Sequence, residues 1–70
     1  MKFIEKLQRG IYLNCDQSFR QDAIAELCDT YHIDPNHPKL DKLFDIAWQL
    51  GHSSGHHEVW LYMKELVELL

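Results

Sequence analysis

Apolar residues recur every three to four positions along most of the chain, and this spacing predicts amphipathic α-helices. In residues 2–13, Phe3, Leu7 and Ile11 lie four apart on one helical face. In residues 18–32, an apolar face lies opposite an acidic one. The pattern predicts an all-α protein with three helical segments, of which the first two form an N-terminal hairpin.

Two polar stretches separate the predicted helices. The first ends at Ser18, which together with Gln21 forms a capping-box pattern that opens helix 18–32. The second contains two prolines, and Pro38 suits the first turn of a third helical segment, residues 38–70.

Residues 51–55 interrupt the third segment and leave two interpretations of it. On one ideal helix, the apolar face of residues 40–50 is rotated by roughly 130° from that of residues 59–70, which indicates a turn. Conversely, Gly51 and Gly55 are four apart, and glycines at that spacing let another helix backbone approach closely. We favour one long helix, straight or kinked, that packs on the N-terminal hairpin and contains Gly55 as a packing glycine.

Beyond Gly55 the third segment has more apolar surface than one neighbouring helix can cover. Its apolar side chains span an arc of about 180°, whereas a surface helix typically has an apolar arc of about 100°. Helix 2–13 of the same chain is one candidate cover, and a symmetry-related helix of a second copy is the other. We favour the second and predict a homo-oligomer, most simply a dimer. The predicted interface consists of Gly51, Gly55, Val59, Trp60, Tyr62, Met63, Leu66, Val67 and Leu70.

Length and charge restrict the number of domains and the kinds of function that the chain can have. A chain of 70 residues supports one core, so residues 1–70 form a single domain. The net charge is −4 and the lysines are scattered, which disfavours nucleic-acid binding because that function needs a concentrated basic patch. No apolar run approaches the roughly 20 residues that span a bilayer. We expect no membrane segment, no signal peptide and a cytoplasmic location.

Three of the five histidines lie in residues 52–57 and invite a chemical interpretation. On a continuous helix, His52 and His56 would point the same way, as the paired imidazoles of helical zinc sites do. No third ligand stands at a diagnostic separation from them. We favour a solvated or packing role over a zinc site, with a pH-sensitive contact as a third alternative.

No catalytic motif accompanies the histidines. Ser53 and Ser54 lack the strand–turn–helix setting of a nucleophile elbow. Gly51 and Gly55 lack the lysine and the preceding strand of a phosphate-binding loop. We therefore expect no enzyme activity, no catalytic residue and no cofactor, zinc being the one candidate metal.

The stretch 47–59, with Gly-His-Ser-Ser-Gly at its centre, continues into Tyr62 and residues 65–67. This part of the chain, about its last half, resembles short uncharacterised proteins of tailed bacteriophages. The resemblance implies a small accessory protein that acts on a host or viral macromolecule in the host cytoplasm. It transfers no catalytic residue to this chain.

These observations favour a non-enzymatic helical interaction module that self-associates and presents an acidic helical surface to a protein partner. The first alternative is a metal- or small-ligand-binding protein organised by His52 and His56. The second is an acidic inhibitor that occupies the basic surface of a nucleic-acid-binding protein.

Overall fold

The computed structural model describes residues 2–13 and 15–70, and every regular element in them is helical. The α-helices are α1 (Phe3–Gln8), α2 (Asp16–Tyr31), α3 (Leu40–Gly51) and α4 (His56–Leu66), and the two 3₁₀ helices are η1 (His52–Ser54) and η2 (Val67–Leu69). The predicted all-α fold is confirmed. None of these described helices is long and apolar enough to cross a membrane.

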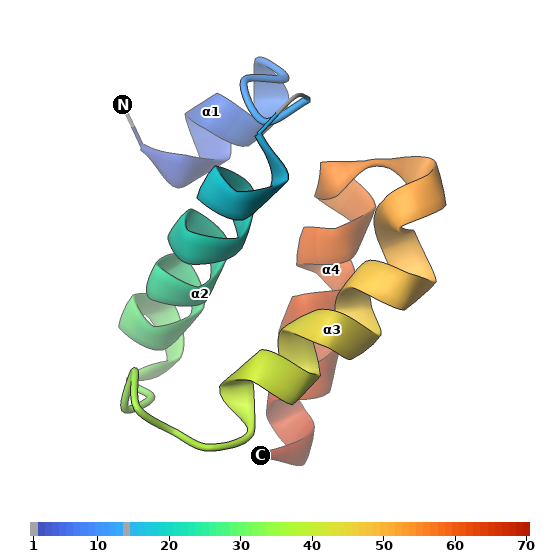
Figure 1. Ribbon diagram of the computed structural model, residues 1–70. Coiled ribbons are helices and arrows are strands. Elements are labelled where there is room, and N and C mark those ends of the chain that lie inside the picture. The colour runs from blue at the N-terminus through green and yellow to red at the C-terminus, as the bar shows by residue number, and fades with distance from the viewer. Residues whose placement is uncertain (1, 14) are drawn as a thin grey trace.

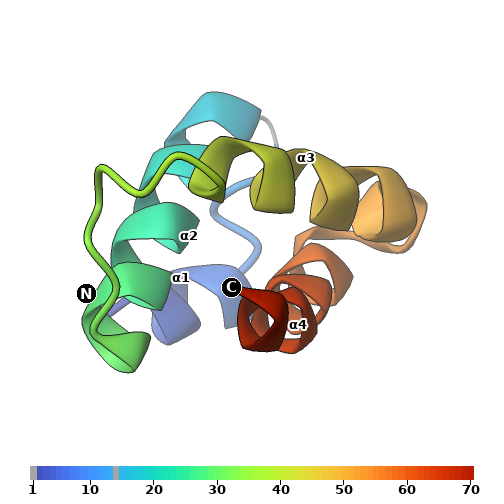
Figure 2. The same cartoon turned by 90° about the horizontal axis from the view of Figure 1, so that it is seen from below.

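The helices form two layers. α3 and α4 lie side by side as an antiparallel hairpin (Figure 1), and this hairpin packs on α1 and α2 (Figure 2). α4 contacts both α1 and α2, whereas α3 contacts α2. The C-terminal helix therefore packs on the N-terminal helices, as predicted.

The N-terminal helices differ from the prediction at their ends. α1 stops at Gln8 instead of residue 13, and Gly10, with φ of 70°, turns the chain out of the helix. α2 begins at Asp16, so Ser18 lies inside the helix and no side chain caps the N-terminus. The predicted capping box is therefore wrong. An acidic residue in the first turn, such as Asp16, is favourable at the positive end of the helix dipole.

Residues 52–55 form a turn, so the single long helix predicted for residues 38–70 is wrong. After η1, Gly55 adopts φ of 113° and ψ of 170°, a conformation that is essentially restricted to glycine. The chain reverses direction there and enters α4. Gly55 is also not a packing glycine, because no atom lies within 4 Å of the position that a Cβ would occupy.

Gly51 is the glycine that permits close helix packing. A Cβ at this position would lie 2.7 Å from the backbone nitrogen of Val59 and 2.9 Å from the carbonyl carbon of Glu58. Real Cβ atoms do not approach backbone so closely, so only glycine fits here. The expected packing glycine is thus Gly51, which lets α3 and α4 of the same chain approach each other closely.

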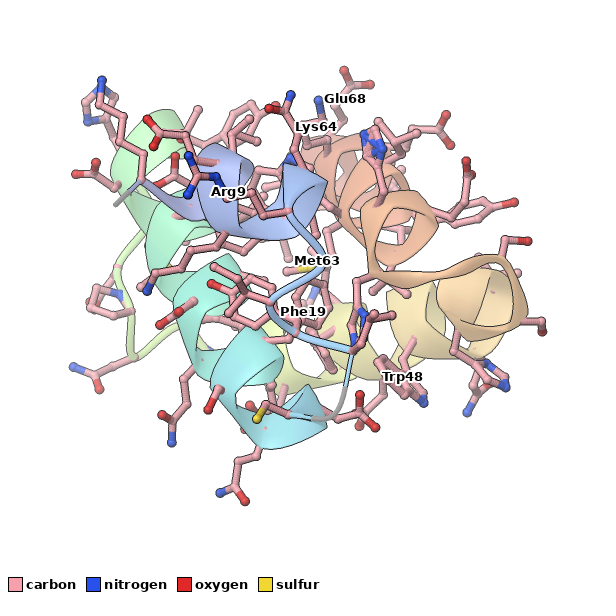
Figure 3. The ribbon with its side chains drawn as sticks, turned by 90° about the horizontal axis from the view of Figure 1, so that it is seen from above. Arg9, Phe19, Trp48, Met63, Lys64 and Glu68 are labelled. Carbon is pink, nitrogen blue, oxygen red and sulfur yellow. The ribbon has the colours of Figure 1, made fainter. Side chains whose placement is uncertain are left out.

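The core between the two layers is rich in aromatic side chains. Phe19 is fully buried at its centre, as Figure 3 shows, and its ring centroid lies 5.4 Å from that of Tyr12 and 5.9 Å from that of Phe44. All four α-helices contribute to this core. Its buried residues are Phe3, Leu7, Tyr12, Phe19, Ala23, Leu27, Cys28, Leu40, Leu43, Phe44, Ala47, Val59, Trp60, Met63 and Val67.

Asp22 anchors the segment after α1 to α2. Its carboxylate accepts a hydrogen bond of 2.6 Å from the Tyr12 hydroxyl and one of 3.3 Å from Lys6 Nζ. The bond from Tyr12, followed by that from Lys6, holds the pKa of Asp22 below its usual value. Burial, and then the bond to Asp22, raise the pKa of Tyr12. The pair therefore favours an ionised Asp22 and a protonated Tyr12.

Candidate functional site

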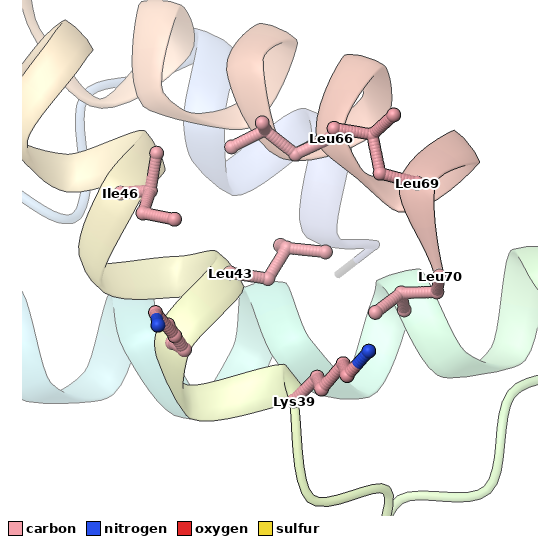
Figure 4. A pocket seen from close by; sticks show the side chains of 7 residues that line it. Lys39, Leu43, Ile46, Leu66, Leu69 and Leu70 are labelled. Atoms are coloured by element: carbon pink, nitrogen blue, oxygen red, sulfur yellow. The ribbon is translucent and has the colours of Figure 1, made fainter.

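An apolar groove of about 260 Å³ opens between α3 and α4, on the face of the hairpin behind which α1 and α2 lie in Figure 4. We call it the hairpin groove. The start of α3 forms one wall, and the end of α4 with η2 forms the other. Its lining residues are Lys39, Lys42, Leu43, Ile46, Leu66, Leu69 and Leu70.

The groove has a buried floor and exposed walls. Leu43 is 5% exposed and forms the floor, whereas Ile46 is 38%, Leu70 41% and Leu69 79% exposed. Fully burying a side chain of this size contributes about 1.5–3 kcal/mol. Covering the walls would therefore stabilise any complex in which an apolar surface enters the groove.

The apolar surface continues along α3 beyond the groove. Leu50 lies one helical turn after Ile46 and is 54% exposed. Together they extend the α3 wall toward the turn at residues 52–55. The hairpin thus presents an apolar ridge beside the groove that no other described element of the chain covers.

Lysines border the α3 wall because the acidic side chains of α3, Asp41 and Asp45, bind a residue of α2 instead. Arg20 of α2 binds Asp41 at 2.9 Å and Asp45 at 3.0 Å, and its guanidinium lies 4.7 Å from the centroid of the Phe44 ring. These carboxylates are thereby directed toward α2. The α3 border of the groove is left with Lys39 and Lys42.

The lining restricts what the groove can do chemically. Among the described residues that line it, no side chain has a carboxylate, hydroxyl, thiol or imidazole group. The charged groups of the lining side chains are the ammonium groups of Lys39 and Lys42. The groove is instead suited to holding apolar side chains, with an acidic group of the ligand near the two lysine ammonium groups.

The residues predicted at an interface fall into different environments. Five of the nine are buried in the core of their own chain: Gly51, Val59, Trp60, Met63 and Val67. The Trp60 ring packs edge-on against Phe3 of α1, with the ring centroids 4.9 Å apart. Helix α1 of the same chain thus covers this part of the apolar arc of α4, which was the alternative to a second copy. The apolar arc is therefore no reason to place these five residues at an interface.

The other four predicted interface residues are at least partly exposed. Leu66 and Leu70 line the hairpin groove, and Tyr62 is half-buried one turn before Leu66. Gly55 lies in the turn, away from the groove. The sequence-based prediction therefore identified the α4 wall of the groove only in part.

The α3 wall was missed entirely. Ile46 and Leu50 follow the buried Leu43 at spacings of three and four residues, and they widen the apolar face of this helix beyond the part that enters the core. An apolar arc wider than one neighbouring helix can cover is therefore a signal in residues 40–50 as well as in the last helix.

His56 ties the start of α4 to α2. Its Nε2–H donates to Asp16 Oδ1 at 2.9 Å, and its ring centroid lies 4.7 Å from that of Phe19 in an edge-on arrangement. The His56 side chain is 15% exposed. This histidine therefore has a packing role as well as a hydrogen-bonding role.

His52 lies across the turn from His56. Its Nδ1–H donates to the Trp48 carbonyl at 2.8 Å, and its ring stacks on Trp48 with the centroids 5.7 Å apart. Both histidines border a hollow of about 280 Å³ together with Asp16 and the half-buried Trp48.

The geometry removes the shared helical face on which the alternative of a zinc site depended. His52 and His56 do not share a helical face, because η1 and Gly55 separate them. In residues 2–13 and 15–70, no three His, Cys, Asp or Glu side chains are grouped to hold a metal ion. Zinc binding itself stays untested.

Comparison with known protein families gives a match to a family of unknown function. A family described as "Family of unknown function (DUF8546)" matches residues 5–70, nearly the whole chain. No curated protein and no solved structure matches the chain.

Proposed function

The chain belongs to this family of unknown function, DUF8546, and from the hairpin groove we propose that it is a non-enzymatic interaction module that associates with a second copy of itself. The docking surface is the groove together with the exposed ridge of α3. In a symmetric dimer, the same patch on both molecules forms the contact.

The observation that supports the proposal is the groove with its exposed walls. Ile46, Leu50 and Leu69 are 38%, 54% and 79% exposed, and they lie on one face of the hairpin. Exposed apolar side chains that gather around a groove mark interaction sites more often than isolated ones do. Burial of this face between two copies would also add to the small core that a domain of this size can build.

Sedimentation equilibrium over a range of micromolar concentrations tests self-association. We expect a weight-average mass that rises above 8.3 kDa and approaches twice that value. A mass that stays at 8.3 kDa at every concentration would overturn the proposal.

A variant pair connects association to the groove. Ile46→Glu places a charge on the groove wall and should shift the protein toward the monomer. Ile4→Glu is a matched control, because Ile4 is 41% exposed and Ile46 38% exposed, but Ile4 lies on α1, outside the groove. Equal weakening by both variants, with unchanged circular dichroism spectra, would place the contact elsewhere.

A further inference from the structure

The charges around the hairpin groove specify how the second copy is oriented. We infer that two copies pack about a two-fold axis that runs along the hairpin, so that α3 of each lies against α4 of the other. Lys39 and Lys42 of one copy then lie opposite Glu65 of the second copy. The inference rests on the proposed self-association and adds its geometry.

The α3 border of the groove is basic. Lys39, Lys42 and Ile46 follow one another at spacings of three and four residues, so they form one ridge, and both lysines line the groove. The carboxylates of Asp41 and Asp45 bind Arg20 on the α2 side of the helix. Charge on the groove side of α3 is therefore of one sign.

One acidic side chain flanks the α4 border. Glu65 is exposed and lies three residues after Tyr62, so these two residues share a face of α4, and Glu65 stands beside the groove without lining it. Lys64 of α4 and Glu68 of η2, in contrast, project on the side away from α3, beside α1, as Figure 3 shows. The acidic charge of Glu65 is thus not neutralised by a lysine on the same face.

The antiparallel hairpin allows two face-to-face arrangements. A two-fold axis parallel to the helices puts α3 of one copy on α4 of the other at the same level, because it leaves the helix direction unchanged. It brings Lys42 near the second copy's Glu65, since the start of α3 lies beside the end of α4. The resulting four helices alternate in direction, as in an antiparallel bundle.

An axis perpendicular to the helices gives the other arrangement. It puts α3 on α3 and α4 on α4, so the acidic faces of the two α4 helices oppose each other, with Glu65 near the second copy's Glu58. Like charges at a contact oppose association. Because each copy also has a net charge of −4, an arrangement that pairs opposite charges is favoured over one that adds acidic contacts.

Charge reversal tests the arrangement. The variants are Lys39→Glu/Lys42→Glu and Glu65→Lys, each measured alone and then mixed in equal amounts. Alone, each variant creates two like-charge contacts per dimer, and its dissociation constant should rise about tenfold. In the mixed dimer both contacts are again between opposite charges, so it should form about as tightly as the parent dimer.

The control is Glu68→Lys, which makes the same charge change on η2, on the side that points away from the groove. It should leave the dissociation constant within about twofold of the parent value. Native mass spectrometry identifies the mixed dimer, and circular dichroism shows that each variant folds. High salt should reduce the differences, because it screens exposed charges.

The outcomes separate the inference from the proposed function. A parent protein that stays monomeric would overturn both. A parent dimer whose association is unchanged by the lysine reversal would leave self-association standing and overturn the orientation, as would a Glu68→Lys effect as large as that of Glu65→Lys. Weakening of both groove variants with recovery in the mixture would establish the orientation.

Discussion

Gly51 lies so close to α4 that a Cβ on it would stand 2.7 Å from the Val59 backbone nitrogen. The obstructing atoms belong to the backbone of α4, which cannot rotate away as the end of a side chain can. The absence of a side chain at Gly51 therefore sets how closely α3 and α4 approach each other at the turn.

Replacing Gly51 should separate the two helices in proportion to the size of the new side chain. Gly51→Ala should lower the free energy of unfolding by about 1–3 kcal/mol through overpacking, and Gly51→Leu by more. Urea denaturation followed by circular dichroism measures both values. An alanine variant as stable as the parent would show that the helices can part without loss.

Gly55 should respond to substitution in a different way. Its φ of 113° disfavours every other residue, but no atom lies within 4 Å of a Cβ built there. Gly55→Ala and Gly55→Leu should therefore both lower the free energy of unfolding by about 1–3 kcal/mol, and by similar amounts, because the penalty comes from the backbone. A leucine variant much less stable than the alanine variant would indicate packing at this site.

Tyr12→Phe should destabilise the fold in a pH-dependent manner. Asp22 has a lowered pKa in the folded protein, so its stabilising contribution is present above its ordinary pKa of 3.8 and is lost as pH falls through the folded value. At neutral pH the loss of the hydroxyl should cost about 1 kcal/mol or less, because the Asp22 side chain is 40% exposed.

Urea titrations of Tyr12→Phe and the parent at neutral pH and at about pH 2 provide the measurement. The difference between the two proteins should shrink at the lower pH, where protonation of Asp22 weakens the bond from Tyr12. Asp22→Asn gives an independent comparison, since it removes the titrating group. A difference that grows on acidification would contradict the assigned role of the pair.

Excess zinc should leave the melting temperature unchanged at neutral pH. A metal that binds only the folded state raises stability by ligand linkage, but His56 donates to Asp16 and His52 to the Trp48 carbonyl, with the turn between them. A rise of several degrees that His52→Ala abolishes would establish a site and contradict this prediction.

The sequence predicted the helices from their periodicity but not the boundary between the last two. Gly51 and Gly55 look alike in the sequence, yet one is helical and the other has φ of 113°. Whether a glycine adopts a positive φ depends on how the helices on either side of it pack together. The periodic pattern of apolar residues does not contain that information. The rotated apolar faces of residues 40–50 and 59–70 did indicate the turn.

The candidate site was predicted only in part for a related reason. The apolar arc of the last helix was correctly taken to need more than one neighbour, but the turn lets α3, α1 and α2 of the same chain serve as those neighbours. Trp60 and Met63 thereby become core residues. Leu69 and Ile46 are among the apolar residues that stay exposed, and their exposure follows from how the hairpin folds back.

The turn at residues 52–55 also has a consequence for the order of folding. α3 and α4 meet after closure of a very short loop, whereas the contact of His56 with Asp16 joins residues 40 apart. Local contacts incur a smaller loss of chain entropy and form early. We therefore expect Gly51→Ala to slow folding and His56→Gln mainly to accelerate unfolding in stopped-flow chevron plots. The hairpin would then act as the nucleus onto which the first two helices assemble.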